Sequence, residues 1–223
     1  MHIEILVEDS SGQKLLEALL PKLLGEQGAP NTWRTIAYRG VGRIPKNLNA
    51  DGDPAKRILL DRLPSLLRGY GRTPGYDAVV VVVDSDSRDC REFLAELKSV
   101  ADSCDPAPNT VFRLAIEEIE AWYLGDRSAL LKAYPKAKKI ALDRYVQDSP
   151  CGTWEILADA IYPGGTKSVK IAGWPLPGQI KHEWATRIGP LLDPARNDSP
   201  SFRKFVDGVN RLVEKLSRPR NPV

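Results

Sequence analysis

The run Asp77-Ala-Val-Val-Val-Val-Val83 is the feature that most limits what this chain can fold into. Consecutive β-branched residues favour a strand, and no polar residue alternates with the valines. A strand that is apolar on both sides is typical of a parallel sheet covered by helices on both faces. We therefore expect this run to form the centre of such a sheet.

Strand-like and helix-like segments alternate around this run. Short apolar segments predict further strands at residues 2–7, 33–38 and 110–116. Helical spacing of apolar residues predicts helices over residues 13–24, 54–68 and 88–101, with Ser10 or Ser11 as the cap of the first. Successive β-α units imply right-handed crossovers, so an α/β, Rossmann-like fold with a mostly parallel four-stranded sheet is expected.

The pattern changes after residue 125. Helical segments separated by Pro- and Gly-containing loops are predicted at residues 128–134, 153–161, 179–191 and 201–216. We expect two parts, an α/β core at residues 1–125 and a helical extension at residues 126–223 that packs on the core.

Composition excludes several classes of protein. The chain has 2 His and 3 Cys, which leaves His-rich metal sites, Ser-His-Asp triads and disulfide scaffolds poorly supplied. No apolar stretch is long enough for a membrane span, and the amino-terminal segment does not read as an export signal. We expect a cytoplasmic protein without a membrane partner, in which carboxylates carry any catalysis.

Acidic residues follow the predicted strands where ligands gather in open α/β sheets. Glu8 follows the first strand, and Asp84 and Asp86 follow the valine run as D-S-D, with Ser85 expected to point away from both carboxylates. Hard oxygen ligands of this kind suit Mg²⁺ or Mn²⁺ bound to a phosphate substrate. The competing interpretation is a loop whose acids cap the following helix.

Three segments of the chain resemble the motifs of a known family: VEDSSG, VVVVVDSDSRDC and RLAIEEIEAWYLGD. They are similar to the bacterial toprim-like domain-of-unknown-function family 4276, which is related to the toprim nucleases of the overcoming-lysogenization-defect type. Segments 38–46 and 199–205 resemble its Gly/basic loop and its carboxy-terminal motif. The resemblance implies a toprim-like fold, bound Mg²⁺ and genes that often lie near AAA-type ATPases.

Carried onto this sequence, the resemblance assigns Glu8 as the strand-end acid and Asp84 with Asp86 as the metal-binding pair. Glu117, Glu118 and Glu120 are candidates for a further acid, and Glu118 and Glu120 are preferred. Many toprim first motifs read E-G-x-x-E, whereas here Asp9 replaces the Gly and Gly12 replaces the second Glu. Any role that needs that second acid is therefore in doubt. Trp122, beside Glu120, is interpreted as a core residue and not as a platform for a nucleic-acid base.

Basic residues offer candidate phosphate ligands. Arg39, Arg43 and Lys46 lie on a Gly-punctuated loop after the second predicted strand, where they could clamp phosphates or simply form a solvated turn. Cations of the carboxy-terminal region could extend a positive surface, although the preferred interpretation is that they simply face solvent. They are Lys167, Lys170, Lys181, Arg187, Arg203 and Lys204.

These observations support three hypotheses. The first is a Mg²⁺-dependent phosphodiesterase, which the resemblance implies is a nuclease that cleaves DNA or RNA in a bacterial defence or DNA-processing system with an AAA-type ATPase partner. The second is a non-catalytic toprim-like module that binds nucleic acid or docks on an ATPase. The third is nucleotidyl transfer or hydrolysis of a small nucleotide at the same site.

Overall fold

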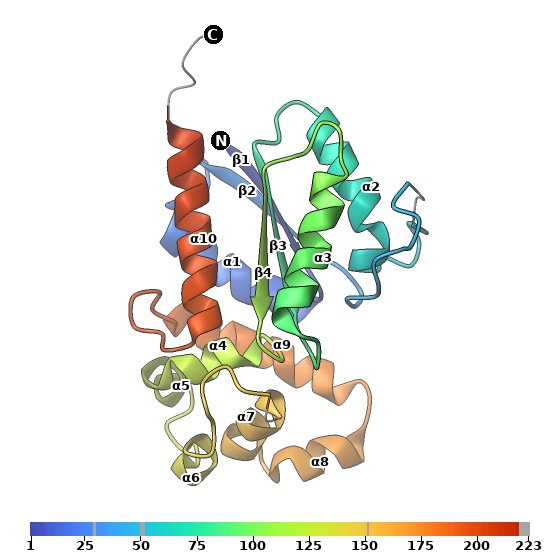
Figure 1. Cartoon of the computed structure of the whole chain (residues 1–223). Coiled ribbons are helices and arrows are strands. Elements are labelled where there is room, and N and C mark those ends of the chain that lie inside the picture. The colour runs from blue at the N-terminus through green and yellow to red at the C-terminus, as the bar shows by residue number, and fades with distance from the viewer. Residues whose placement is uncertain (29, 50–51, 151, 219–223) are drawn as a thin grey trace.

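A parallel β-sheet with helices on both faces forms the body of the molecule (Figure 1). The computed structural model describes residues 1–28, 30–49, 52–150 and 152–218. In these ranges the strands are β1 (His2–Val7), β2 (Thr32–Ala37), β3 (Ala78–Asp84) and β4 (Thr110–Ala115). Their order across the sheet is β2-β1-β3-β4, and each neighbouring pair is parallel. The expected four-stranded α/β, Rossmann-like class is thereby confirmed.

Helices connect the strands and continue beyond them. Those between strands are α1 (Ser10–Leu24), α2 (Leu59–Arg72) and α3 (Cys90–Asp102). After β4 come α4 (Glu120–Gly125), α5 (Arg127–Ala133), α6 (Lys139–Leu142), α7 (Thr153–Ile161), α8 (Gly165–Ala172), α9 (Leu176–Ile188), the 3₁₀ helix η1 (Gly189–Leu191) and α10 (Pro200–Ser217).

The valine run of β3 supplies both hydrophobic cores. Successive side chains of a strand point to opposite faces, so Val80 and Val82 enter one core while Val79, Val81 and Val83 enter the other. Helices α2 and α3 cover the second core, and α1 with the helices after β4 covers the first. Because both faces are covered, the strand is apolar throughout and does not alternate.

One helix has another cap than expected, one starts later than expected, and one was not predicted. Asp9, and neither Ser10 nor Ser11, caps α1, because its carboxylate accepts a 2.7 Å hydrogen bond from the Gly12 N–H. Helix α2 begins at Leu59, later than the predicted start at residue 54. Helix α8 was not predicted, since the Gly-rich segment before it reads as a loop.

The segments before and after residue 125 share one hydrophobic core. Trp122 of α4 is fully buried and stacks on Phe205 of α10 with ring centroids 5.0 Å apart, so its interpretation as a core residue is confirmed. Its indole N–H donates a 3.0 Å hydrogen bond to Ser201 Oγ. The division into parts at residues 125 and 126 stays a prediction. No helix in the described ranges is long and apolar enough to cross a membrane.

Candidate functional site

The sheet brings acids from separate strands to one edge. Register pairs Val7 of β1 with Val82 of β3, and Asp84 of β3 with Ala115 of β4. Because parallel strands end at the same edge, Glu8, Asp84 and the acids after β4 all lie at the carboxyl end of the sheet. The crossovers therefore gather acids that are far apart in the sequence.

The charges of these acids act on one another's pKa values. Burial, followed by the charges of Asp86 and Asp9, raises the pKa of Glu8 to about 7. Burial and the charges of Glu8 and Glu120 raise the pKa of Asp84 well above its usual value. Like charges that raise the pKa of a neighbouring carboxyl create a site that favours a cation or a proton.

Glu120 lies deepest in this cluster. Its side chain is 1% exposed, and burial raises its pKa despite the opposing charge of Lys181. Its Oε1 atom and the Oε2 atoms of Glu8 and Glu118 are buried without a hydrogen-bond partner. Buried carboxylate oxygens without partners are costly, so this edge of the sheet is built for a ligand that can accept their lone pairs.

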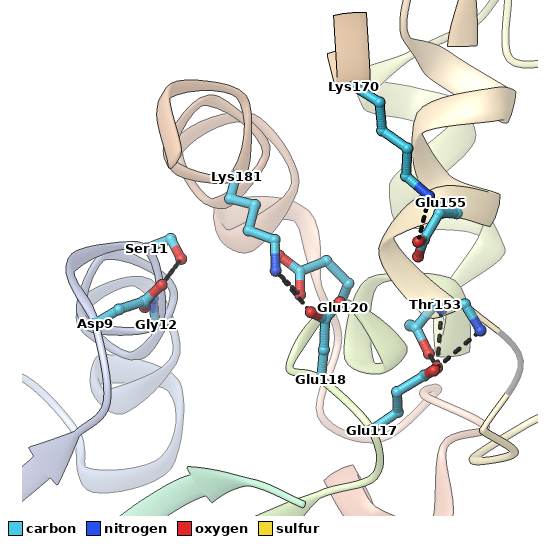
Figure 2. A network of polar contacts seen from close by, with 11 residues as sticks. Asp9, Ser11, Gly12, Glu117, Glu118, Glu120, Thr153, Glu155, Lys170 and Lys181 are labelled. Carbon is cyan, nitrogen blue, oxygen red and sulfur yellow. Dashed lines mark hydrogen bonds and ion pairs between the residues drawn. The ribbon is translucent and has the colours of Figure 1, made fainter. Parts of the chain in front are cut away.

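Lys181 of α9 enters the cluster, and its interpretation as a solvent-facing cation is wrong. Its Nζ atom donates to Glu118 Oε1 at 3.1 Å and to Glu120 Oε2 at 3.4 Å (Figure 2). Its side chain is 19% exposed. Burial alone would disfavour the ammonium, but the charges of Glu120, Glu118 and Asp84 raise the pKa of Lys181 above its ordinary value. The extension thus contributes a permanent positive charge to the acid edge.

Tyr123 is a further polar group that the sequence analysis did not identify. It is fully buried, and its hydroxyl has no hydrogen-bond partner among the described residues. Burial and the charges of Glu120, Asp9 and Asp84 raise its pKa well above the usual tyrosine value. Its position three residues after Glu120 on one helix was the signal that could have indicated it.

The D-S-D segment does not present its two acids equally. Asp84 is partly exposed at the end of β3, whereas Asp86 is exposed and adopts a left-handed φ of 48°. Ser85 is buried, and its Oγ accepts a 2.8 Å hydrogen bond from the Glu117 N–H. This bond ties the loop after β3 to the loop after β4, while Asp86 still acts on Glu8 through its charge.

Glu117 has a structural role. Its carboxylate accepts hydrogen bonds from the backbone of Gly152 at 3.0 Å and of Thr153 at 2.8 Å, and from the Thr153 hydroxyl (Figure 2). These groups form the start of α7, so Glu117 caps that helix from a distance. The preference for Glu118 and Glu120 as site acids agrees with this placement.

Packing explains why the first motif lacks its second acid. A Cβ atom at Gly12 would lie 2.7 Å from Val7 Cγ2 and 3.3 Å from Asp9 Oδ1. No side chain can therefore be accommodated there without movement of β1 or of the helix cap. A glutamate at this position, as in E-G-x-x-E, does not fit this backbone.

The basic loop begins beside the acid edge. The Gly40 N–H donates a 3.0 Å hydrogen bond to the Glu8 carbonyl, and Arg39, Arg43 and Lys46 are exposed. Within the described ranges no ion pair involves these cations. Gly42 is required, because a Cβ atom there would lie 2.1 Å from Ile58 Cγ2. The loop is thus fixed at its base and presents unneutralised charge to solvent.

The acids fit a hard divalent cation in chemistry but are not closed around one. Carboxylate oxygens are the ligands that Mg²⁺ and Mn²⁺ prefer, and unpaired buried oxygens are present at three of the glutamates. Across the described part of the chain, no group of three or more His, Cys, Asp or Glu side chains is placed to hold a metal ion. Side chains would have to move for an ion to bind, and the assignment of Glu8, Asp84 and Asp86 as its ligands stays a prediction.

Fold and site together define a parallel α/β protein with a lysine-paired acid cluster at the carboxyl edge of its sheet. The model of the family described as Domain of unknown function (DUF4276) matches residues 7–210, and the chain belongs to this family. No curated protein and no solved structure matches the chain. The family resemblance drawn from the motifs is confirmed, whereas the wider relation to toprim nucleases stays a hypothesis.

Proposed function

We propose that this protein is a Mg²⁺- or Mn²⁺-dependent phosphodiesterase of the toprim type, a nuclease that acts on DNA or RNA in the cytoplasm. The observation that carries the proposal is that acids from different strand ends act on one another. The charge of Glu8 raises the pKa of Asp84, and the charges of Asp86 and Asp9 raise the pKa of Glu8, so the cluster favours a cation. The motifs that resemble toprim nucleases add the expectation of a bacterial defence or DNA-processing system and of an AAA-type ATPase partner.

In this proposal Glu8, Asp84 and Asp86 would hold the metal ion. The ion would supply Lewis-acid chemistry, which lowers the pKa of a water molecule and neutralises phosphate charge. Glu118 or Glu120 would orient the attacking water, since each keeps an unpaired carboxylate oxygen. Arg39, Arg43 and Lys46 would bind phosphates of the substrate on the exposed side of the cluster.

Lys181 bears on how many metal ions the site takes. A second metal ion is not needed here, because the ammonium already lies between Glu118 and Glu120 and neutralises part of their charge. We expect a single ion at Glu8, Asp84 and Asp86, with Lys181 in place of a second cation.

The test is cleavage of labelled single- and double-stranded DNA and RNA with Mg²⁺, Mn²⁺ or a chelator. Asp84→Asn should reduce the metal-dependent rate by a factor on the order of 100 or more. Asp89→Asn is the matched control, because Asp89 caps α3 in the same loop and asparagine caps equally well. Small nucleotides belong in the same substrate panel, since their hydrolysis or transfer would indicate the third hypothesis.

The non-catalytic module is the second candidate, and the ion pair of Lys181 with two of the acids favours it. If this ammonium satisfies the cluster, no metal ion is needed. Calorimetric titration of the protein with Mg²⁺ and Mn²⁺ separates the two functions. Heat of binding that is lost in Asp84→Asn supports the enzyme, whereas absence of binding together with tight binding of nucleic acid supports the module.

A further inference from the structure

A groove of about 380 Å³ lies along the edge of β4. Its walls come from α3, which contributes Arg91 and Leu94, and from α10, which contributes Lys204 and Arg211. These helices cover opposite faces of the sheet, and β4 is visible between them in Figure 1. A groove lined by both helices and by β4 is therefore at the free edge of the sheet, where β4 has no further neighbour in the described strand order.

The floor of this groove carries backbone groups that can pair with another strand. The N–H groups of Val79 and Ser85 donate to the carbonyls of Asn109 and Ala115. Every second residue of β4, Val111 and Arg113 included, therefore turns its N–H and C=O groups toward β3. Those of the alternate residues, Phe112 and Leu114, point away from the sheet into the groove. The Phe112 carbonyl accepts a 2.6 Å hydrogen bond from Arg113 Nη1, so the N–H of Phe112 and both groups of Leu114 are the open positions.

The rim of the groove is positively charged. Four cations line it, Arg91, Arg113, Lys204 and Arg211, against two carboxylates, Asp148 and Asp207. One of these carboxylates, Asp148, already accepts hydrogen bonds from Ser199 and Ser201. In the described ranges none of the four cations forms an ion pair.

Arg113 is the most constrained of these cations. Its Nε atom donates a 2.6 Å hydrogen bond to the Lys204 carbonyl. Its guanidinium packs against Gly208, where a Cβ atom would lie 1.9 Å from Arg113 Nη2. Burial and the neighbouring charge of Arg211 lower its pKa. A half-buried guanidinium that is destabilised by a second cation favours an anionic ligand nearby.

We propose that this groove is a docking site for an acidic, extended peptide segment of a partner protein, which adds to β4 as a further strand. The open backbone groups would form the ladder, Leu94 and Leu114 would contact its apolar side chains, and the cationic rim would bind its carboxylates. A second copy of the chain is disfavoured, because pairing of two β4 edges would bring like charges together. A nucleic-acid strand is also disfavoured, because its backbone has no N–H groups that could donate to the open carbonyl of Leu114.

The test uses a fluorescein-labelled peptide of alternating glutamate and valine and measures anisotropy with the full-length protein. We expect saturable binding that weakens with salt. The same peptide N-methylated on the backbone edge that faces β4 should bind about tenfold or more weakly, because it cannot form the ladder. Equal binding of both peptides would refute strand addition.

Two variants locate the binding site on the protein. Arg211→Glu should weaken peptide binding about tenfold, whereas Lys215→Glu on the same helix, outside the groove lining, should change it little. Leu114→Pro removes an outward N–H while it spares the bonds to β3, and prolines are tolerated on edge strands, so it should also weaken binding. Circular dichroism confirms that each variant is folded.

The remaining outcomes decide between occupants. Single-stranded DNA is added at the same concentration of negative charge as the peptide. If it displaces the peptide, and if DNA binding is lost in Arg211→Glu, the groove is a nucleic-acid site. A concentration-dependent dimer that Arg211→Glu abolishes would assign it to a second copy. Either result, or the absence of peptide binding, would overturn the proposal without touching the metal-dependent cleavage assay.

Discussion

The Nζ atom of Lys181 lies 3.1 Å from Glu118 Oε1, and both side chains are about one-fifth exposed, at 19% and 21%. The lysine comes from α9 and the glutamate from the loop after β4, so the extension supplies the counter-charge for acids of the sheet. This ion pair determines several measurable properties of the cluster.

Removal of the ammonium should destabilise the fold. Lys181→Met leaves Glu118 and the buried Glu120 without a cation, and we expect a loss of about 3 kcal/mol in the free energy of unfolding. Addition of Mg²⁺ should recover part of this loss if an ion can replace the ammonium. Chemical denaturation with and without Mg²⁺ measures both effects.

Lys170→Met is the control for this prediction. Lys170 also forms an ion pair with a glutamate, Glu155 at 3.2 Å, but the two side chains are 60% and 31% exposed (Figure 2). Exposed pairs contribute about 1 kcal/mol or less. Equal losses in the two variants would show that the Lys181 pair is an ordinary surface contact.

The acid cluster should make the metal-free protein less stable as pH rises. Glu8 has a folded pKa of about 7 against an ordinary value of 4.5. Between these values the folded chain binds more protons than the unfolded chain, so stability falls with increasing pH through this window. The effect of Glu8 is about 3 kcal/mol at most. Melting temperatures recorded with chelator from about pH 5 to about pH 8 test the sign.

Glu8→Gln should make this pH profile shallower without abolishing it, because burial and the charge of Glu120 also raise the pKa of Glu118 to about 7. Glu26→Gln, at an exposed position after α1, should leave the profile unchanged. Asp126 does not interfere with the measurement. Burial would raise its pKa, but hydrogen bonds from Arg196, Ala129 and Asp193 lower it below 3.8. Its contribution is present above that value and is lost only as pH falls further, outside the window of Glu8. A flat wild-type profile would contradict the coupling of the acids.

Substitution of Glu117 should lower stability without affecting metal binding or cleavage. Glu117→Ala removes the carboxylate that caps α7 and should cost about 1 kcal/mol of stability. Metal binding and any cleavage should persist, because both of its carboxylate oxygens accept hydrogen bonds from the start of α7. Glu120→Gln is the comparison, since it should reduce activity with a smaller effect on α7. Loss of metal binding in Glu117→Ala would place this residue in the site.

The basic loop should act on affinity and leave stability unchanged. Arg39→Ala and Arg43→Ala remove exposed cations, so each should weaken nucleic-acid binding and lower the slope of log affinity against log salt by about one. Lys139→Ala, an exposed position on α6, is the control. Filter binding at several salt concentrations measures the slope. Unchanged slopes would indicate the alternative of a solvated turn.

Local sequence patterns were sufficient for the strands and for most of the long helices. The valine run predicted a strand buried on both faces, and the parallel sheet follows from the alternation of strands and helices. The gathering of Glu8, Asp84 and Glu120 could be predicted because parallel strands share one carboxyl edge. The late start of α2 could not be predicted, because it depends on contacts of the preceding loop with the rest of the chain. One such contact is the hydrogen bond that the Arg43 N–H donates to the Asp61 carboxylate.

The sequence by itself determined the layered class of fold and the family, because the periodicity of apolar residues and the motifs can be seen in short segments. It also determined the acidic edge of the sheet, because the acids directly follow the strands. Only the tertiary structure decided which charges meet. Lys181 stands 61 residues from Glu120, and its ammonium enters the cluster because α9 packs on α1. Glu117 was likewise directed to α7 by a contact 36 residues away. Such contacts depend on the free energy of packing whole helices, which no short pattern of residues encodes.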